Sequence, residues 1–237
     1  MEREINFANP VLERVQSAYR VLMRKVFLWM ALALTVTGLI AYYVASNPGL
    51  LQAVFSSKGM IWGLFIAQIA LVLILSARIN KMSFATAGIM FVGYSVLNGI
   101  TMSFIFLAFT MSSIAGAFFV TAGMFGAMAL IGLTTKKDLT SFRSFFMMAL
   151  VGLIIASVVN IFWANSVLYW IITYVGVLLF VGLTAYDTQK IKLMLMEYGD
   201  EVNGQTQKLA LLGSLSLYLD FINLFLYILR IFGRGDN

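Results

Sequence analysis

Long stretches without a single charged side chain are the feature that most limits what this chain can fold into. No charged residue appears between Lys81 and Lys136, and a second uncharged stretch runs from Ser144 to Tyr186. About 20 apolar residues in a helix cross a hydrocarbon layer about 30 Å thick. Divided at their polar breaks and taken with three further apolar runs, these stretches predict seven spans, at roughly residues 26–45, 60–77, 84–109, 113–133, 144–163, 167–187 and 209–229.

The composition excludes a water-soluble globular domain. Hydrophobic residues make up 61% of the chain and charged residues 11%, whereas soluble domains average about 45–50% and about 25%. A domain of 237 residues leaves much of its surface facing outward, so it could not hide this much apolar surface from water. The chain has no cysteine and no histidine, which excludes disulfides, thiolate nucleophiles and the Cys and His sites that hold zinc or haem.

We therefore expect an all-α integral membrane protein, built as a bundle of seven transmembrane helices. Backbone polar groups in lipid must find hydrogen-bond partners inside the protein, and the continuous apolar runs lack the alternation of barrel strands. Small residues such as Gly126 favour close packing of helices. Asn98 and Asn160 lie inside spans and are expected to hydrogen-bond between helices.

One membrane domain, residues 25–232, is expected between two short end segments. Residues 1–24 would form a cytoplasmic N-terminal segment, and residues 233–237 a C-terminal tail. Apolar residues recur at helical spacing in the first segment, which favours a short amphipathic helix on the membrane surface; a solvated tail is the alternative. These residues are Val11, Val15, Ala18 and Leu22.

The distribution of Lys and Arg predicts the orientation. The N-terminal segment holds five of these residues, the turn between spans two and three holds two, and the loops after spans four and six hold three each. Short cytoplasmic loops are enriched in positive charge, so the N-terminus is expected in the cytoplasm. Seven spans then place the C-terminus outside, although Arg230 and Arg234 near it leave a re-entrant last segment as an alternative. The net charge of +6 thus reflects topology and not a nucleic-acid partner.

Asp220 lies about midway along the last apolar run. An aspartate at that depth costs about 2.5–3.5 kcal/mol on insertion scales, so it needs a partner, a proton or water. Ser216 and Asn223 share its helix face. A structural acid held by a single cation is the alternative interpretation.

Asp187 is the second candidate acid, at the cytoplasmic end of the sixth apolar run. It could be a solvated residue at a helix boundary. It would reach the depth of Asp220 only if the sixth helix continued for roughly two to three turns beyond it. Two carboxylates that met in a poorly solvated site could not both ionise cheaply, so they would share one proton. Loss of that proton, or a competing divalent cation, would push the helices apart, which makes the pair a candidate pH-sensitive latch.

Three short segments carry a specific pattern: TKKDL at residues 135–139, AYDTQ at 185–189 and LYLDFINLF at 217–225. Together they resemble the Bax inhibitor-1 (TMBIM) family, and most of all its bacterial, YbhL-like inner-membrane members. The resemblance implies a seven-helix bundle with helix seven near the centre. It also implies a pH-sensitive calcium leak channel gated by two aspartates, here Asp187 and Asp220. An arginine of the family at the cytoplasmic end of helix two matches Arg78, for which an ordinary flanking charge is the alternative role.

A passive leak of cations, of calcium above all, is therefore the expected function, in a bacterial inner membrane. Calcium takes six to eight oxygen ligands. Asp187 and Asp220, with Asn223, backbone carbonyls and water, would form only a weak, transient calcium site, which suits an ion that must leave again. No resident cofactor is expected; the expected partners are membrane lipid, calcium and protons.

Other function classes compete with the leak. An adaptor that binds other membrane proteins, and so modulates stress responses or a membrane protease, needs no transport. A proton-coupled transporter could also use a buried acid. An intramembrane aspartyl protease fits poorly, because the residues before Asp220 lack the Gly-x-Gly-Asp pattern, and we expect no enzymatic activity.

Overall fold

The computed structural model describes residues 10–199 and 201–233, and its long elements are helices. Within these residues, seven helical segments are long and apolar enough to cross a membrane, which confirms the predicted number. The α-helices are α1 Pro10–Ala45, α2 Pro48–Phe55, α3 Lys58–Arg78, α4 Phe84–Met102, α5 Ile105–Ala108, α6 Met111–Thr134, α7 Arg143–Trp163, α8 Ser166–Tyr198 and α9 Gly204–Phe232, and the 3-10 helices are η1 Ile79–Lys81 and η2 Thr140–Phe142.

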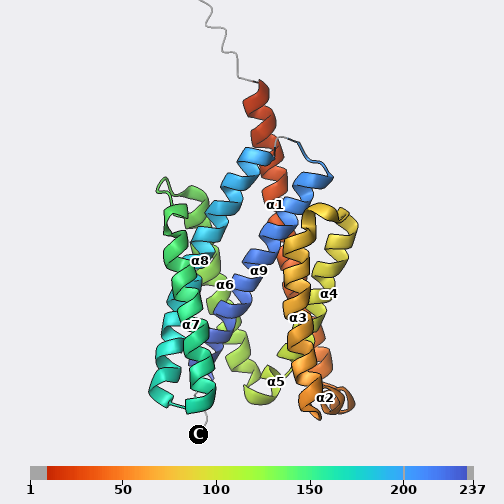
Figure 1. The fold of residues 1–237 in the computed structure, drawn as a ribbon, viewed down its shortest axis with the longest axis vertical. Coiled ribbons are helices and arrows are strands. Elements are labelled where there is room, and N and C mark those ends of the chain that lie inside the picture. Colours follow the sequence, from red (N-terminus) through yellow and green to blue (C-terminus); the bar gives the residue numbers. More distant parts are fainter. Residues whose placement is uncertain (1–9, 200, 234–237) are drawn as a thin grey trace, which may run out of the picture.

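Helix α9 lies at the centre of the bundle, as expected of the seventh span (Figure 1). It packs against α8, α1, α6 and α4, and 67% of its most apolar window is buried within the protein. The corresponding share is 6% for both α3 and α7. These two helices therefore form the periphery and present most of their surface to the surrounding lipid.

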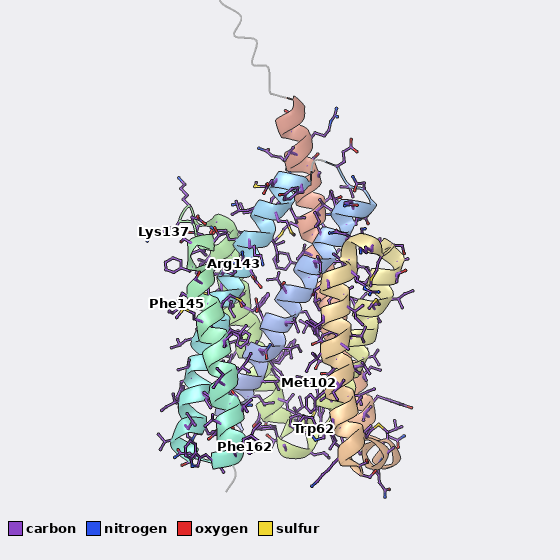
Figure 2. All side chains as sticks on the ribbon, in the orientation of Figure 1. Trp62, Met102, Lys137, Arg143, Phe145 and Phe162 are labelled. Atoms are coloured by element: carbon purple, nitrogen blue, oxygen red, sulfur yellow. The ribbon has the colours of Figure 1, made fainter. Side chains whose placement is uncertain are left out.

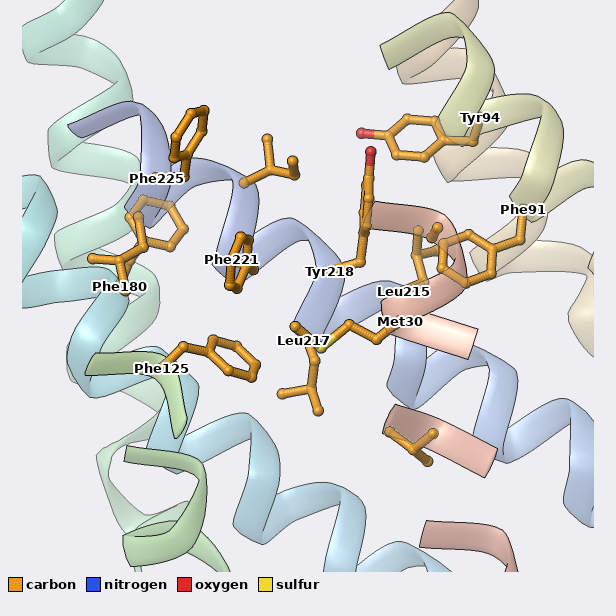
Figure 3. Close-up of a cluster of buried hydrophobic side chains, with 14 of the residues drawn as sticks. Met30, Phe91, Tyr94, Phe125, Phe180, Leu215, Leu217, Tyr218, Phe221 and Phe225 are labelled. Atoms are coloured by element: carbon orange, nitrogen blue, oxygen red, sulfur yellow. The ribbon is translucent and has the colours of Figure 1, made fainter. Parts of the chain in front are cut away.

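Aromatic side chains of α9 contact α6 on one side and α4 on the other (Figure 3). The Phe221 ring meets the Phe125 ring of α6 edge-on, with centroids 5.5 Å apart. The Tyr218 ring meets Phe91 and Tyr94 of α4 in the same manner, each at 5.8 Å. Such edge-to-face pairs contribute about 0.5–1.5 kcal/mol beyond their buried area, so α9 is held from both sides.

Helix α1 begins at Pro10 and continues without a break into the first span. Ala18 and Leu22 are buried, so this part of the predicted amphipathic segment packs into the protein as the first turns of a long helix. The side chain of Val11, residues 1–9 and residues 234–237 lie outside the described residues.

The basic loops gather at one end of the bundle. Lys137 and Arg143 lie at the end from which α1 projects, and Trp62 and Phe162 lie toward the opposite end (Figure 2). This separation agrees with the charge count that predicts a cytoplasmic N-terminus. At the opposite end Arg230 stacks over the rings of Tyr227 and Tyr169, at 5.1 and 5.5 Å from their centroids.

Candidate functional site

Asp187 lies inside helix α8 and not at its end. The helix continues to Tyr198, eleven residues beyond Asp187, which is about three turns. This extension meets the condition for the two acids to reach comparable depth. Asp220 lies near the middle of the neighbouring helix α9.

Asp187 and Asp220 both line one cavity of about 340 Å³. Three helices form it: α7 supplies a mainly apolar wall, and α8 and α9 each supply one aspartate. We call it the acid pocket. Its lining residues are Arg143, Phe146, Met147, Leu150, Phe180, Leu183, Tyr186, Asp187, Lys190, Ser216, Leu219, Asp220 and Asn223.

Asp220 is the more buried of the two acids, with 5% of its surface exposed. Its Oδ2 atom is buried and accepts no hydrogen bond from the described residues. The Asn223 side chain lines the same pocket, but its amide donates to the Leu219 carbonyl of its own helix at 2.8 Å. A buried carboxylate oxygen without a donor is costly, so this atom is where a proton, a water or a cation would be bound.

Asp187 is half-buried and lines the same cavity as Asp220. The structure therefore places Asp187, Asp220 and Asn223 in one pocket. Arg78, the last residue of α3, is exposed and is not among the residues that line it.

The basic residues of the pocket are Arg143 and Lys190, and neither was predicted from the sequence to belong to the site. Lys190 lines the pocket together with both aspartates. One signal could have found it: Lys190 follows Asp187 by three residues, a spacing that puts both side chains on one helix face. Arg143 is the first residue of α7, and no spacing in the sequence connects it with α8.

Two of the three motif segments contact each other beside the pocket. The Gln189 amide donates to the Lys137 carbonyl at 2.8 Å and accepts from the Leu139 amide at 2.7 Å. Lys192 donates to the Leu133 carbonyl at the end of α6 at 2.6 Å. These bonds fix the α6–α7 loop against α8, close to Asp187.

The same loop holds its own acid. Asp138 accepts hydrogen bonds from the backbone amide and the hydroxyl of Thr140, at 2.9 and 2.6 Å. These bonds favour the charged carboxylate and hold the pKa of Asp138 below its usual value. Asp138 thus closes a local turn with Thr140 just before η2, and it is not among the residues that line the acid pocket.

The described residues contain no cluster of three or more His, Cys, Asp or Glu side chains able to hold a metal ion. The acid pocket offers a metal two carboxylates and neutral oxygens. Calcium sites of high affinity use more carboxylate ligands, so any cation bound here would be held weakly.

Comparison with known proteins agrees with this architecture. A sequence model described as "Inhibitor of apoptosis-promoting Bax1" matches residues 19–237. The Escherichia coli K12 protein named "Inner membrane protein YbhL" is 48% identical over 212 residues, which cover 90% of this chain and 91% of that protein. Uncharacterized proteins of Deinococcus radiodurans and Borreliella burgdorferi are each 41% identical, over 92% and 91% of this chain and 92% of either relative. The chain belongs to the Bax inhibitor-1 family.

Proposed function

We propose that this protein is a pH-sensitive leak channel for cations, calcium above all, in a bacterial inner membrane, and that Asp187 and Asp220 form its gate. The observation that carries the proposal is the buried Asp220 oxygen without a donor, in a pocket shared with a second aspartate. The location follows from the Escherichia coli relative, which is an inner membrane protein.

Proton sharing gives the gate its closed state. Two carboxylates that face each other in a poorly solvated pocket repel when both are ionised, whereas one shared proton removes half the charge and joins them. Asp187 belongs to α8 and Asp220 to α9. The shared proton would therefore hold these two helices together, and its loss would favour their separation.

Calcium suits the opened pocket. Carboxylate, amide and hydroxyl oxygens are the ligands that a hard cation prefers, and Asp187, Asp220, Asn223 and Ser216 line the same cavity. The peripheral helix α7 closes one side and is little buried. Weak binding by two carboxylates allows an ion to enter and to leave, as conduction requires.

A flux assay in liposomes tests the proposal. We expect Asp187→Asn and Asp220→Asn to abolish most of the pH dependence of calcium flux, because neither variant can share a proton between two carboxylates. Glu197→Gln is the matched control, since it makes the same chemical change on the exposed surface of α8 and should behave as the unchanged protein.

Flux whose rate and pH dependence survive both aspartate substitutions would contradict the gate. If the unchanged protein itself conducted no cation, the leak would be refuted. The adaptor function would then be favoured by binding to a membrane protein that persists in both variants.

A further inference from the structure

The acid pocket contains as many basic groups as acidic ones. Its ionisable lining groups are Asp187 and Asp220, the bases Arg143 and Lys190, and the phenol of Tyr186. With both acids ionised and both bases protonated, the two negative and two positive charges balance. A cation that enters the pocket therefore meets the positive charges of Arg143 and Lys190 among its lining groups.

Lys190 is the basic residue of the pocket that lies on the same helix as one of the acids. It lies three residues beyond Asp187 on α8, a spacing that places both side chains on one face. Its side chain lines the same pocket as Asp187 and Asp220.

The Lys190 ammonium is loosely held. Its nitrogen lies 6.0 Å from the centroid of the Tyr186 ring, and its side chain is exposed. Among the described residues it forms no close ion pair with either carboxylate. An ammonium on a flexible four-carbon chain can approach or leave a carboxylate at little cost.

We infer that Lys190 is a tethered cation that competes with calcium for the Asp187–Asp220 carboxylates and so sets the affinity of the pocket for divalent cations. This inference rests on the proposed function only in that the two acids bind a cation; it does not require conduction. A divalent ion at the carboxylates must displace the Lys190 ammonium toward solvent. Removing the ammonium therefore removes a competitor and a repulsive charge at once.

Calcium binding to the purified full-length protein in detergent tests the inference, at one fixed pH. Terbium serves as the probe, because aromatic side chains such as Tyr186 sensitise its emission, and calcium is measured by displacing it. We expect Lys190→Gln to lower the dissociation constant for calcium about tenfold, as expected for one unit charge near a partly solvated site. Lys190→Arg, which keeps the charge, should stay within about threefold of the unchanged protein.

Lys136→Gln is the matched control, because it removes the same charge from an exposed position in the loop before η2, outside the acid pocket. We expect it to change calcium affinity less than about threefold. Equal tightening by Lys190→Gln and Lys136→Gln would overturn the inference, since the general positive charge of this end of the protein would then explain both. Unchanged or weaker binding in Lys190→Gln would overturn it as well.

The outcome for Lys190 is separable from the outcome for the leak. Tighter calcium binding in Lys190→Gln, lost again when Asp220→Asn is added, would support the inference even if liposomes showed no flux. Calcium binding that Asp220→Asn leaves intact would overturn it, because the competition would then occur elsewhere.

Discussion

Tyr218 and Asp220 lie two residues apart on α9 and make their contacts on opposite sides of this helix. The Tyr218 hydroxyl hydrogen-bonds Thr37 Oγ1 of α1 at 2.7 Å and accepts from the Asn98 amide of α4 at 2.9 Å. Asp220 lines the acid pocket formed with α7 and α8. Residues two apart on a helix are separated by about 200°, so one turn of α9 carries a fixed polar contact on one side and the candidate gate on the other.

The Tyr218 contact should stabilise the bundle without taking part in gating. We expect Tyr218→Phe to lower the stability of the protein in detergent by about 1–2 kcal/mol, because the Asn98 amide and the Thr37 hydroxyl lose a buried partner. Thermal unfolding followed by circular dichroism measures the change. Tyr174→Phe, at an exposed position of α8, is the control and should leave the unfolding temperature unchanged. A Tyr218→Phe protein as stable as this control would contradict the role of the contact.

The sequence predicted the spans well, because a bilayer dictates the length and polarity of each helix. It also predicted that α8 and α9 could bring Asp187 and Asp220 together, since consecutive spans are antiparallel neighbours. Asn98 hydrogen-bonds to another helix as expected. The same expectation was wrong for Asn160, whose side chain accepts from the Asn165 backbone amide at 3.1 Å. Asn160 lies three residues from the end of α7, where the local turn offers a nearer partner.

What the sequence could not predict depends on contacts between distant segments. Tyr218 gains its partners only when α1, α4 and α9 meet. Arg143 enters the pocket because α7 packs beside α8. Charges at span ends usually reflect membrane topology. The sequence therefore predicts Arg143 only as a flanking charge of its span, although it also lines the pocket.

Close approach of α6 and α8 gives a second test of the fold. A Cβ atom at Gly132 would collide with the Ala185 carbonyl and lie 2.9 Å from Thr188 Cβ, two positions that flank Asp187 on α8. We expect Gly132→Ala to destabilise the protein by about 1–3 kcal/mol, because backbone must move. Gly126→Ala on the same helix is the control, since no atom lies within 4 Å of its added Cβ. Equal unfolding temperatures for the two variants would contradict this packing.

The aspartate pair should make stability depend on pH. A folded state that keeps a proton which the unfolded chain has released loses stability as pH rises. We therefore expect the apparent unfolding temperature of the unchanged protein to fall as the pH rises above the ordinary range of an aspartate pKa. It should fall less in Asp220→Asn, which keeps a neutral amide in the pocket. Glu197→Gln should keep the full dependence. An Asp220→Asn protein with the unchanged slope would show that the pair does not share a proton.

Lys208 should hold the turn between α3 and α4. This side chain is 8% exposed, and its ammonium donates to the carbonyls of Asn80 and Met82 at 3.3 and 3.1 Å. We expect Lys208→Met to destabilise the protein by about 1–3 kcal/mol, because two carbonyls lose a charged donor. Hydrogen exchange of residues 79–83 should accelerate. Lys58→Met, at an exposed position at the start of α3, is the control and should leave exchange there unchanged.

The orientation can be measured directly because the chain has no cysteine, so a single introduced thiol reports one position. Ser141 is exposed in η2, at the end of the bundle that carries Lys137 and Arg143 (Figure 2), and Ser57 is exposed before α3 at the opposite end. The excess of positive charge at the first end predicts that it faces the cytoplasm. A membrane-impermeant maleimide added to spheroplasts should therefore label Ser57→Cys at once and Ser141→Cys only after permeabilisation. The reverse order would contradict a cytoplasmic N-terminus, because it would place the end of the bundle that carries Lys137 and Arg143, and with it the Arg143 side of the acid pocket, outside the cytoplasm.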